Sequence, residues 1–142
     1  MKSERRIVLD TNALISAAIL QNSISNQALT LAAAQFEIVV SEATWTEFET
    51  RIERPKLFRY FGNLEAQREE VVKTLGRVVK HVPVQSVVTD CRDADDNKFL
   101  ALALDSAAAF IVTGDRALLE LHPWRGVHLL SPGAFVRLEG TL

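Results

Sequence analysis

The sequence predicts an α/β protein in which helices cover both faces of a parallel sheet. Short apolar segments rich in β-branched residues occur at 6–9, 36–40, 110–113 and 127–130, and segments of this size indicate buried strands. Between residues 81 and 97, Pro83 and a cluster of acids indicate one more short strand followed by a loop. Because strands alternate with helical segments from end to end, a parallel sheet is expected.

The helical segments are recognised by their composition and by the spacing of their apolar residues. Trp45, Phe48 and Ile52 lie three and four positions apart, so they share one face of a helix. Pro55 interrupts that helix, and Gly62-Asn63 marks a turn. The helices are expected at 12–20, 26–34, 42–52, 65–79, 97–108 and 117–121, with a last short one opened by Ser131-Pro132-Gly133.

Length and composition indicate one globular domain over residues 1–142. Of the 142 residues, 48% are hydrophobic and 24% are charged, which is typical of a folded protein and not of a disordered one. Cys91 is the single cysteine, so no intrachain disulfide can form, and no segment has the length of a signal peptide or of a membrane span. We expect a soluble cytoplasmic protein. The net charge of −2 excludes a strongly basic nucleic-acid binder by bulk charge.

Acidic residues stand where the ends of the predicted strands would bring them together. Asp10 directly follows the first strand, and Asp115 follows the strand at 110–113. Functional groups of open parallel sheets gather beyond the carboxyl ends of the strands, where the strand order reverses. Asp93, Asp95 and Asp96 precede the helix at 97–108 and can approach from a third side.

Such a group of carboxylates indicates a divalent cation. Like charges at close range raise one another's pKa unless a cation neutralises them. Carboxylate oxygens are hard ligands, which favours Mg²⁺ or Mn²⁺. No spacing typical of zinc ligands is present, because His81, His122, His128 and Cys91 are scattered. The chemistry expected at such a site is activation of water and neutralisation of charge at a phosphodiester.

Each acid also has an ordinary structural interpretation. Asp10 and Asp115 could cap the helices that follow them, and Asp93 or Asp95 could cap the helix near Asn97. Two acids at strand ends and a third acidic cluster favour a shared metal site over capping alone.

The glutamate of such a site is not selected by periodicity. Glu42 and Glu49 lie on one side of the 42–52 helix and Glu47 on another, and Glu47 could simply pair with Arg51 at i,i+4.

The chain resembles the PIN-domain family, and most closely its bacterial VapC-like toxin branch, the toxin components of type II toxin–antitoxin systems. The resemblance extends over most of the chain in the order typical of the family. The fragments that carry it are VLDTNALISA at 8–17, SEATWTE at 41–47, RPKL at 54–57, CRDADDNKFLALAL at 91–104 and FIVTGDRALL at 110–119.

This resemblance implies a three-layer α/β/α domain with a parallel sheet of about five strands and a Mg²⁺- or Mn²⁺-dependent ribonuclease activity. By the family's motif, the metal-binding and catalytic acids are Asp10, Glu47, Asp96 and Asp115. Asp93 matches an additional acid of the toxin branch that binds the metal or only caps a helix. Thr11, Asn12 and Thr113 match polar positions of the family, whose side chains orient carboxylates or water.

The resemblance also implies partners and a mechanism. The partners are RNA, a cognate antitoxin protein that would bind operator DNA, and a second copy of the chain in a homodimer. Water activated by the metal would attack the phosphodiester and leave a 5′-phosphate and a 3′-hydroxyl. Basic residues that could steer phosphate, or equally stay solvated, are Arg51, Arg54, Lys56, Arg59, Lys98 and Arg116.

Four alternative functions compete with this one. Haloacid-dehalogenase-type phosphatases need a second aspartate two positions after the first, where this chain has Asn12. Receiver domains need paired acids near the first strand, and Glu4 lies upstream of it. A PIN-fold nuclease of RNA processing and a non-catalytic binding module stay open.

Overall fold

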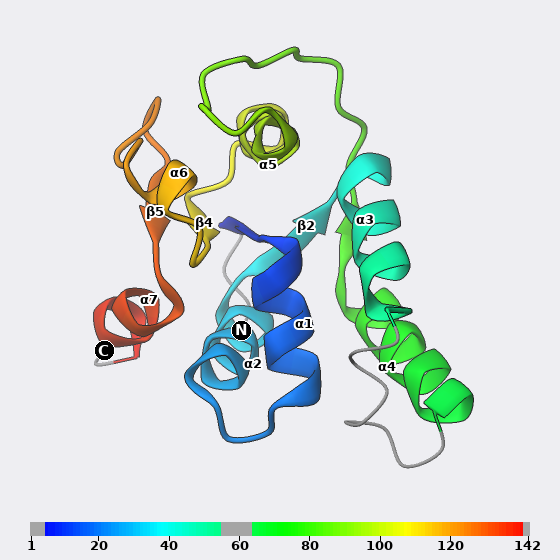
Figure 1. Ribbon diagram of the computed structural model, residues 1–142. Helices are drawn as coiled ribbons and strands as arrows, with labels where there is room; N and C mark the ends of the chain where they lie inside the picture. Colours follow the sequence, from blue (N-terminus) through cyan, green and yellow to red (C-terminus); the bar gives the residue numbers. More distant parts are fainter. Residues whose placement is uncertain (1–4, 55–63, 141–142) are drawn as a thin grey trace.

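The computed structural model describes residues 5–54 and 64–140 and places them in a sheet with helices on both sides (Figure 1). The elements in chain order are β1 (Arg6–Leu9), α1 (Thr11–Ile19), α2 (Ile24–Gln35), β2 (Glu37–Val40), α3 (Glu42–Ile52), α4 (Leu64–Val78), β3 (Lys80–His81), the 3-10 helix η2 (Ala94–Asp96), α5 (Asn97–Ser106), β4 (Phe110–Val112), α6 (Arg116–Leu119), β5 (His128–Leu130) and α7 (Pro132–Glu139).

The sheet has five strands in the order β3-β2-β1-β4-β5, and every neighbouring pair is parallel. β1 pairs with β2 on one side and with β4 on the other, with Leu9 opposite Val112. The chain therefore adds β2 and β3 on one side of β1 and later adds β4 and β5 on the other side. This reversal of strand order lies between β1 and β4, so their carboxyl ends open onto the crevice where α/β proteins bind ligands.

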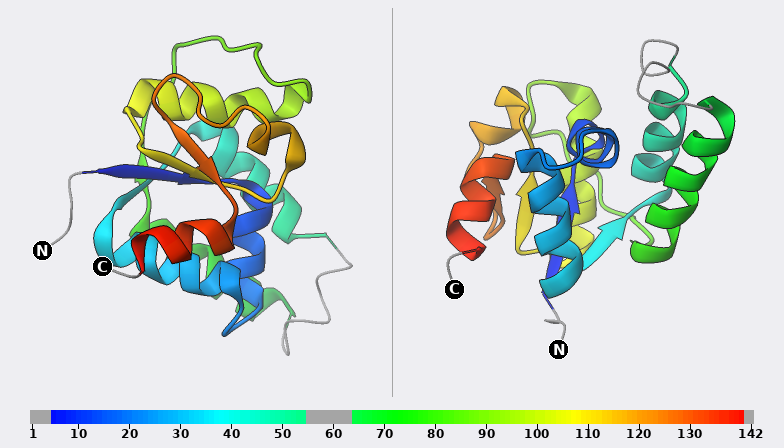
Figure 2. Two further views of the ribbon diagram at one scale, coloured as in Figure 1. Left: turned by 90° about the vertical axis from the view of Figure 1, so that its left-hand side faces the viewer. Right: turned by 90° about the horizontal axis from the view of Figure 1, so that it is seen from below.

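Alternating side chains of the strands build two separate cores, one on each face of the sheet. Ile7 and Leu9 of β1 pack with residues of α1, α2, α3, α4 and α7, including Phe36 and Phe135. Val8 packs on the opposite face with residues of α5 and α6. Figure 2 (left) shows the resulting layers, with α5 on one side of the sheet and α2 and α7 on the other. The expected three-layer α/β/α fold with five parallel strands is confirmed.

Most element boundaries differ from the predicted ones by one or two residues. The helix predicted at 97–108 ends at Ser106, because Ala107 adopts a left-handed conformation with φ of 56° and turns the chain toward β4. The helix predicted at 117–121 is α6, Arg116–Leu119. A short strand is predicted between residues 81 and 97, and β3, Lys80–His81, overlaps that range only at His81. The turn predicted at 62–63 lies outside the described residues.

Within residues 5–54 and 64–140, no helix combines the length and the apolar character that crossing a lipid bilayer requires.

Candidate active site

Asp10 is anchored between the two central strands at the point where their order reverses. Its backbone N–H donates to Val112 O at 3.0 Å, which extends the pairing of β1 with β4 by one residue. One carboxylate oxygen accepts from Ala13 N at 2.8 Å and thereby caps α1, and the other accepts from the Thr113 hydroxyl at 2.5 Å. Asp10 therefore does cap α1, but the cap uses only one of its two carboxylate oxygens.

Thr113 connects Asp10 to Asp115. Its hydroxyl donates to Asp10 and accepts from the backbone N–H of Asp115 at 2.9 Å, and the residue is fully buried. Asp115 in turn caps α6 by accepting from Ala117 N at 2.8 Å. Both strand-end aspartates are thus fixed by helix caps, and one buried threonine sets their spacing.

The loop before α5 brings two further acids to the same place. Asp93 caps η2 rather than α5, with its side chain accepting from Asp95 N at 3.2 Å. The Asn97 side chain accepts from Cys91 N at 2.8 Å and holds the loop against the start of α5. Asp93, Asp96 and Asp115 each offer a carboxylate oxygen, and these oxygens lie within 4.8 Å of one another.

These three carboxylates fit a divalent cation. Asp96 Oδ2 is buried and has no hydrogen-bond partner among the described residues, which leaves an oxygen lone pair for a ligand. Burial, hydrogen bonding with Asp115 and the negative charges of Asp115, Asp93 and Asp10 raise the pKa of Asp96 to about 7. A group of hard oxygen donors whose ionised forms repel one another is suited to Mg²⁺ or Mn²⁺.

Burial also raises the pKa of Asp10. Its hydrogen bonds from Thr113 and Ala13 oppose that effect, whereas the charges of Asp115 and Glu47 add to it. The Coulombic influence of both acids on Asp10 means that the strand end and the α3 glutamate belong to one electrostatic site. Asp10 is only 5% exposed, so it forms the floor of this site.

Glu47 differs from the other acids because the protein itself neutralises it. Its carboxylate is hydrogen-bonded by Lys98 Nζ from α5 and lies 3.5 Å from Arg51 Nη2 of its own helix. Partial burial alone would raise the pKa of Glu47, but hydrogen bonding with Lys98 and Thr11 and the positive charges of Lys98 and Arg51 lower it below its usual value. The predicted i,i+4 pair of Glu47 with Arg51 is confirmed, and Glu47 lies outside the group formed by Asp93, Asp96 and Asp115.

The other polar residues expected at the site have varied surroundings. Thr11 is buried at the start of α1 beside Asp10, whereas the exposed Asn12 accepts a hydrogen bond of 3.2 Å from Arg51. Arg54 and Arg116 are exposed. Lys56 and Arg59 lie outside the described residues. The pairing of Lys98 with Glu47 is the contact that sequence reasoning missed, because no local spacing relates two residues 51 positions apart.

The histidines and the cysteine do not assemble a zinc site in the part of the chain that the structure describes. His122 accepts from Leu129 N at 3.0 Å, His128 stacks against Phe110 and His81 lies edge-on to Trp45. Cys91 is buried and directs its thiol to Ala117 O at 3.6 Å. These residues have structural partners of their own.

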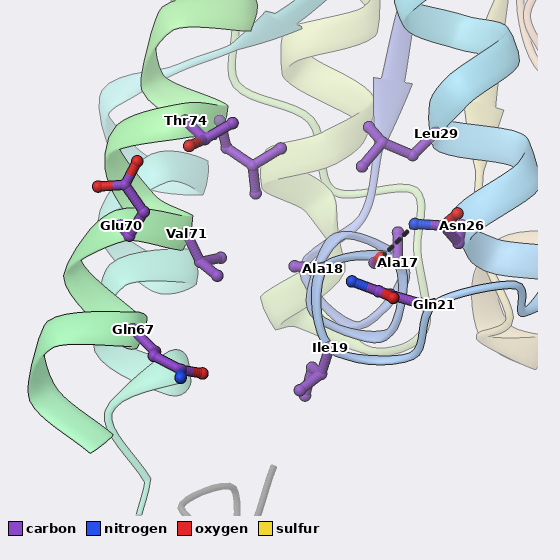
Figure 3. Close-up of a pocket in the computed structure, with 11 residues that line it drawn as sticks. Ala17, Ala18, Ile19, Gln21, Asn26, Leu29, Gln67, Glu70, Val71 and Thr74 are labelled. Carbon is purple, nitrogen blue, oxygen red and sulfur yellow. Dashed lines mark hydrogen bonds between the residues drawn. The ribbon is translucent and has the colours of Figure 1, made fainter. Parts of the chain in front are cut away.

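A separate groove lies away from the acidic site. It has a volume of about 680 Å³ and separates α1 and α2 from α4 (Figure 3), and Glu70 is the one carboxylate among the described residues that line it. Ala17, Ala18 and Ile19 face Gln67, Val71 and Thr74 across it. None of the predicted site acids borders this groove.

The comparisons with known proteins agree with the fold and the motifs. Residues 6–117 match the PIN domain family model, a span that includes all five candidate acids. The uncharacterised protein MJ1680 of Methanocaldococcus jannaschii is 34% identical to this chain over 122 residues, which is 84% of this chain and 77% of the relative.

Solved structures with the same fold include VapBC2 from Rickettsia felis, bound to a DNA fragment from its promoter. The likeness has a TM-score of 0.60 at 12% identity and covers 87% of this chain and 96% of that one. PAE2754 from Pyrobaculum aerophilum has a TM-score of 0.59 at 17% identity, covering 96% of this chain and 90% of that one. At these identities the structural likeness establishes the fold, and the sequence matches establish the family. The chain therefore belongs to the PIN-domain family, whose fold is a nuclease fold.

Proposed function

We propose that this protein is a metal-dependent endoribonuclease that acts as the toxin of a type II toxin–antitoxin pair, with one domain over residues 1–142. The observation that carries the catalytic part is the buried oxygen of Asp96. It lacks a hydrogen-bond partner among the described residues and lies with Asp93 and Asp115 beyond the carboxyl ends of β1 and β4. A protein gains no stability from such an arrangement alone, because carboxylates held close together repel one another.

The residues that would hold Mg²⁺ or Mn²⁺ are Asp96 and Asp115, with Asp93 at the exposed rim. Asp10 and Glu47 complete the acidic set from the floor and from α3. When bound, the cation would supply water activation and would neutralise charge that develops on the phosphate.

The chain's own contribution is to position the acids before the cation binds. Thr113 fixes one oxygen of Asp10 and the backbone of Asp115, so that neither acid depends on a mobile side-chain rotamer for its placement. Lys98 and Arg51 bring positive charge to the α3 side of the site, where it can attract an RNA phosphate.

The toxin assignment draws on the family motifs and on the similar fold of the VapBC2 structure from Rickettsia felis, which is bound to promoter DNA. An intracellular ribonuclease would damage its own host, so an inhibitory partner is physically sensible. We therefore propose a cognate antitoxin protein that covers the acidic site and binds operator DNA, and a homodimer as the form of the toxin.

Catalysis is tested with purified protein and single-stranded RNA in Mn²⁺, in Mg²⁺ and in excess EDTA. The parent protein should cleave RNA only with metal and leave a 5′-phosphate. Asp10→Asn should fold and yet lose at least about 100-fold in cleavage rate, as expected when a carboxylate charge that helps to hold the cation is removed. Asp105→Asn is a matched control, because Asp105 lies far along α5 and accepts hydrogen bonds from Gln85 N and Ser86 N instead. Equal cleavage by Asp10→Asn and the parent would overturn the assignment.

Toxicity is tested separately by inducing the parent and Asp10→Asn in the native host after deletion of the neighbouring genes. Growth arrest by the parent alone is expected. Continued growth with an active enzyme would indicate a PIN-fold nuclease of RNA processing, and RNA binding without cleavage would indicate a non-catalytic binding module.

A further inference from the structure

Lys98 links one acid of the candidate site to a neighbouring helix. It is the second residue of α5, and its ammonium group hydrogen-bonds Glu47 Oε2 on α3. The side chains of Lys98 and Glu47 are 26% and 14% exposed, so this ion pair is largely withdrawn from water. A cation of the protein therefore occupies the carboxylate that the family motif assigns to a divalent metal.

Glu47 lies near the other acids but is engaged elsewhere. Its charge contributes to the raised pKa of Asp10, which means that the two carboxylates interact. Yet the carboxylate oxygens that lie within 4.8 Å of one another come from Asp93, Asp96 and Asp115. Glu47 can join these acids only if its contact with Lys98 is loosened.

On its other side, Lys98 borders an open groove. The groove has a volume of about 610 Å³ and lies between α3, α5 and the loop after β3, with Thr46, Val84 and Ser86 among its lining residues. The four-carbon stem of a lysine is flexible, so an ammonium released from Glu47 can turn into this groove without any movement of the backbone. Lys98 thus lies between this groove and the acidic site, because it lines the groove and contacts Glu47.

We propose that Lys98 is a displaceable counter-ion, which holds Glu47 in the metal-free protein and exchanges that contact for an RNA phosphate when Glu47 turns to the metal. The inference rests on the proposed function. Lys98 then has two partners in succession, and its positive charge becomes available to RNA only when a cation has replaced it at Glu47.

This exchange has a signature that a purely structural ion pair lacks. Loss of the ammonium removes a cation that competes for Glu47 and repels the incoming metal, so the metal should bind more tightly. Loss of the same ammonium removes a phosphate contact, so RNA should bind more weakly. If Lys98 merely braced Glu47 in its binding position, both affinities would fall together.

The test measures Mn²⁺ binding by calorimetry and the binding of a short single-stranded RNA by fluorescence anisotropy, with Ca²⁺ in place of Mn²⁺ to slow cleavage. Lys98→Met should bind Mn²⁺ about 3- to 10-fold more tightly than the parent and RNA about 3- to 10-fold more weakly, which is the range expected for one partly screened charge. Lys98→Gln is a second neutral variant with a polar end, so that poor folding of one variant does not decide the result. Lys98→Arg keeps the charge and should restore both affinities to within about twofold of the parent.

Lys73→Met on α4 is the matched control, because it removes the same charge from an exposed residue that lines a different pocket, which none of the five candidate site acids borders. Both of its affinities should equal those of the parent. Weaker or unchanged Mn²⁺ binding by both neutral Lys98 variants would overturn the counter-ion role while leaving the metal site intact. A parent that binds no Mn²⁺, or binds it as well as Asp96→Asn does, would overturn the proposed function and this inference with it.

Discussion

The two sides of the acidic site differ in whether the protein balances their negative charge. On the α3 side, Glu47 is paired with Lys98 and Arg51, and its pKa lies below the usual value. On the side of η2 and β4, Asp96 faces Asp93 and Asp115, and its pKa is raised to about 7. Among the described residues, no ion pair involves these three aspartates.

This difference indicates where an external cation is needed. The protein supplies the counter-charge of Glu47 through residues of its own, so that side is complete without a ligand. Among the described residues, no such ion pair involves the three aspartates, although the charge of Asp115 acts on Arg92. The repulsion among the three aspartates is relieved by protonation or by a divalent cation.

The largest effect is expected from Asp96→Asn, which removes the charge of the acid with the unpartnered oxygen. Mn²⁺ affinity and RNA cleavage should both fall at least about 100-fold, since a direct metal ligand is lost. Asp95→Asn is the control, because this exposed neighbour carries the same charge one position away. If the two variants were equally active, the account of the aspartate side would be wrong.

A smaller loss is expected from Thr113→Val, which preserves shape but removes the hydroxyl that joins Asp10 to Asp115. Asp10 would lose a charge-assisted hydrogen bond while staying buried, so the free energy of unfolding should fall by about 2 kcal/mol. Cleavage should fall about 10-fold because both aspartates lose their spacing. Chemical denaturation and initial cleavage rates measure the two effects. Thr113→Ser keeps the hydroxyl and should retain most of the stability and activity; an equally large loss in this variant would contradict the role of the hydrogen bond.

The acids at the strand ends could be predicted from the sequence because the cause of their placement is local. Asp10 and Asp115 each follow an apolar strand, and parallel strands end at the same edge of the sheet. Helix periodicity could not choose among Glu42, Glu47 and Glu49, so Glu47 came from the family resemblance.

The remaining features depend on tertiary packing. The contact of Lys98 with Glu47 follows from how α5 lies against α3, and the hydrogen bond of Thr113 with Asp10 joins residues 103 positions apart. The end of α5 at Ser106 depends on the left-handed conformation of Ala107. Alanine rarely adopts this conformation, so the residue type does not predict it. The catalytic roles of all five acids stay predictions.

An effect of moderate size is expected in the pH dependence of the metal-free protein. The pKa of Asp96 is about 7 in the folded state and near 3.8 in the unfolded state, so the folded protein keeps a proton that the unfolded chain has released. The stability that this proton provides is fully present below about pH 4 and is lost as the pH rises to about 7.

The free energy of unfolding measured in EDTA should therefore decrease more over this interval in the parent than in Asp96→Asn. Taking the difference between the two proteins removes the opposing contributions of Glu47 and Asp105, whose pKa values are lowered. Parallel pH profiles would contradict the assigned repulsion.

The smallest effect is expected at the rim, where Asp93 both caps η2 and adjoins Asp96 and Asp115. Asn is as good a cap as Asp, so Asp93→Asn removes the charge without removing the cap. Mn²⁺ affinity should fall about 3-fold if the carboxylate helps to hold the cation. Unchanged affinity in Asp93→Asn, combined with lower stability in Asp93→Ala, would assign Asp93 to capping alone.

The central claim is that a divalent cation binds beyond the carboxyl ends of β1 and β4. The most direct measurement is anomalous X-ray scattering from a crystal soaked in Mn²⁺. The account predicts an anomalous peak among the carboxylates of Asp93, Asp96 and Asp115, within about 2.5 Å of the oxygens that bind it. Manganese bound at another place in the molecule, with none at these three carboxylates, would contradict the account.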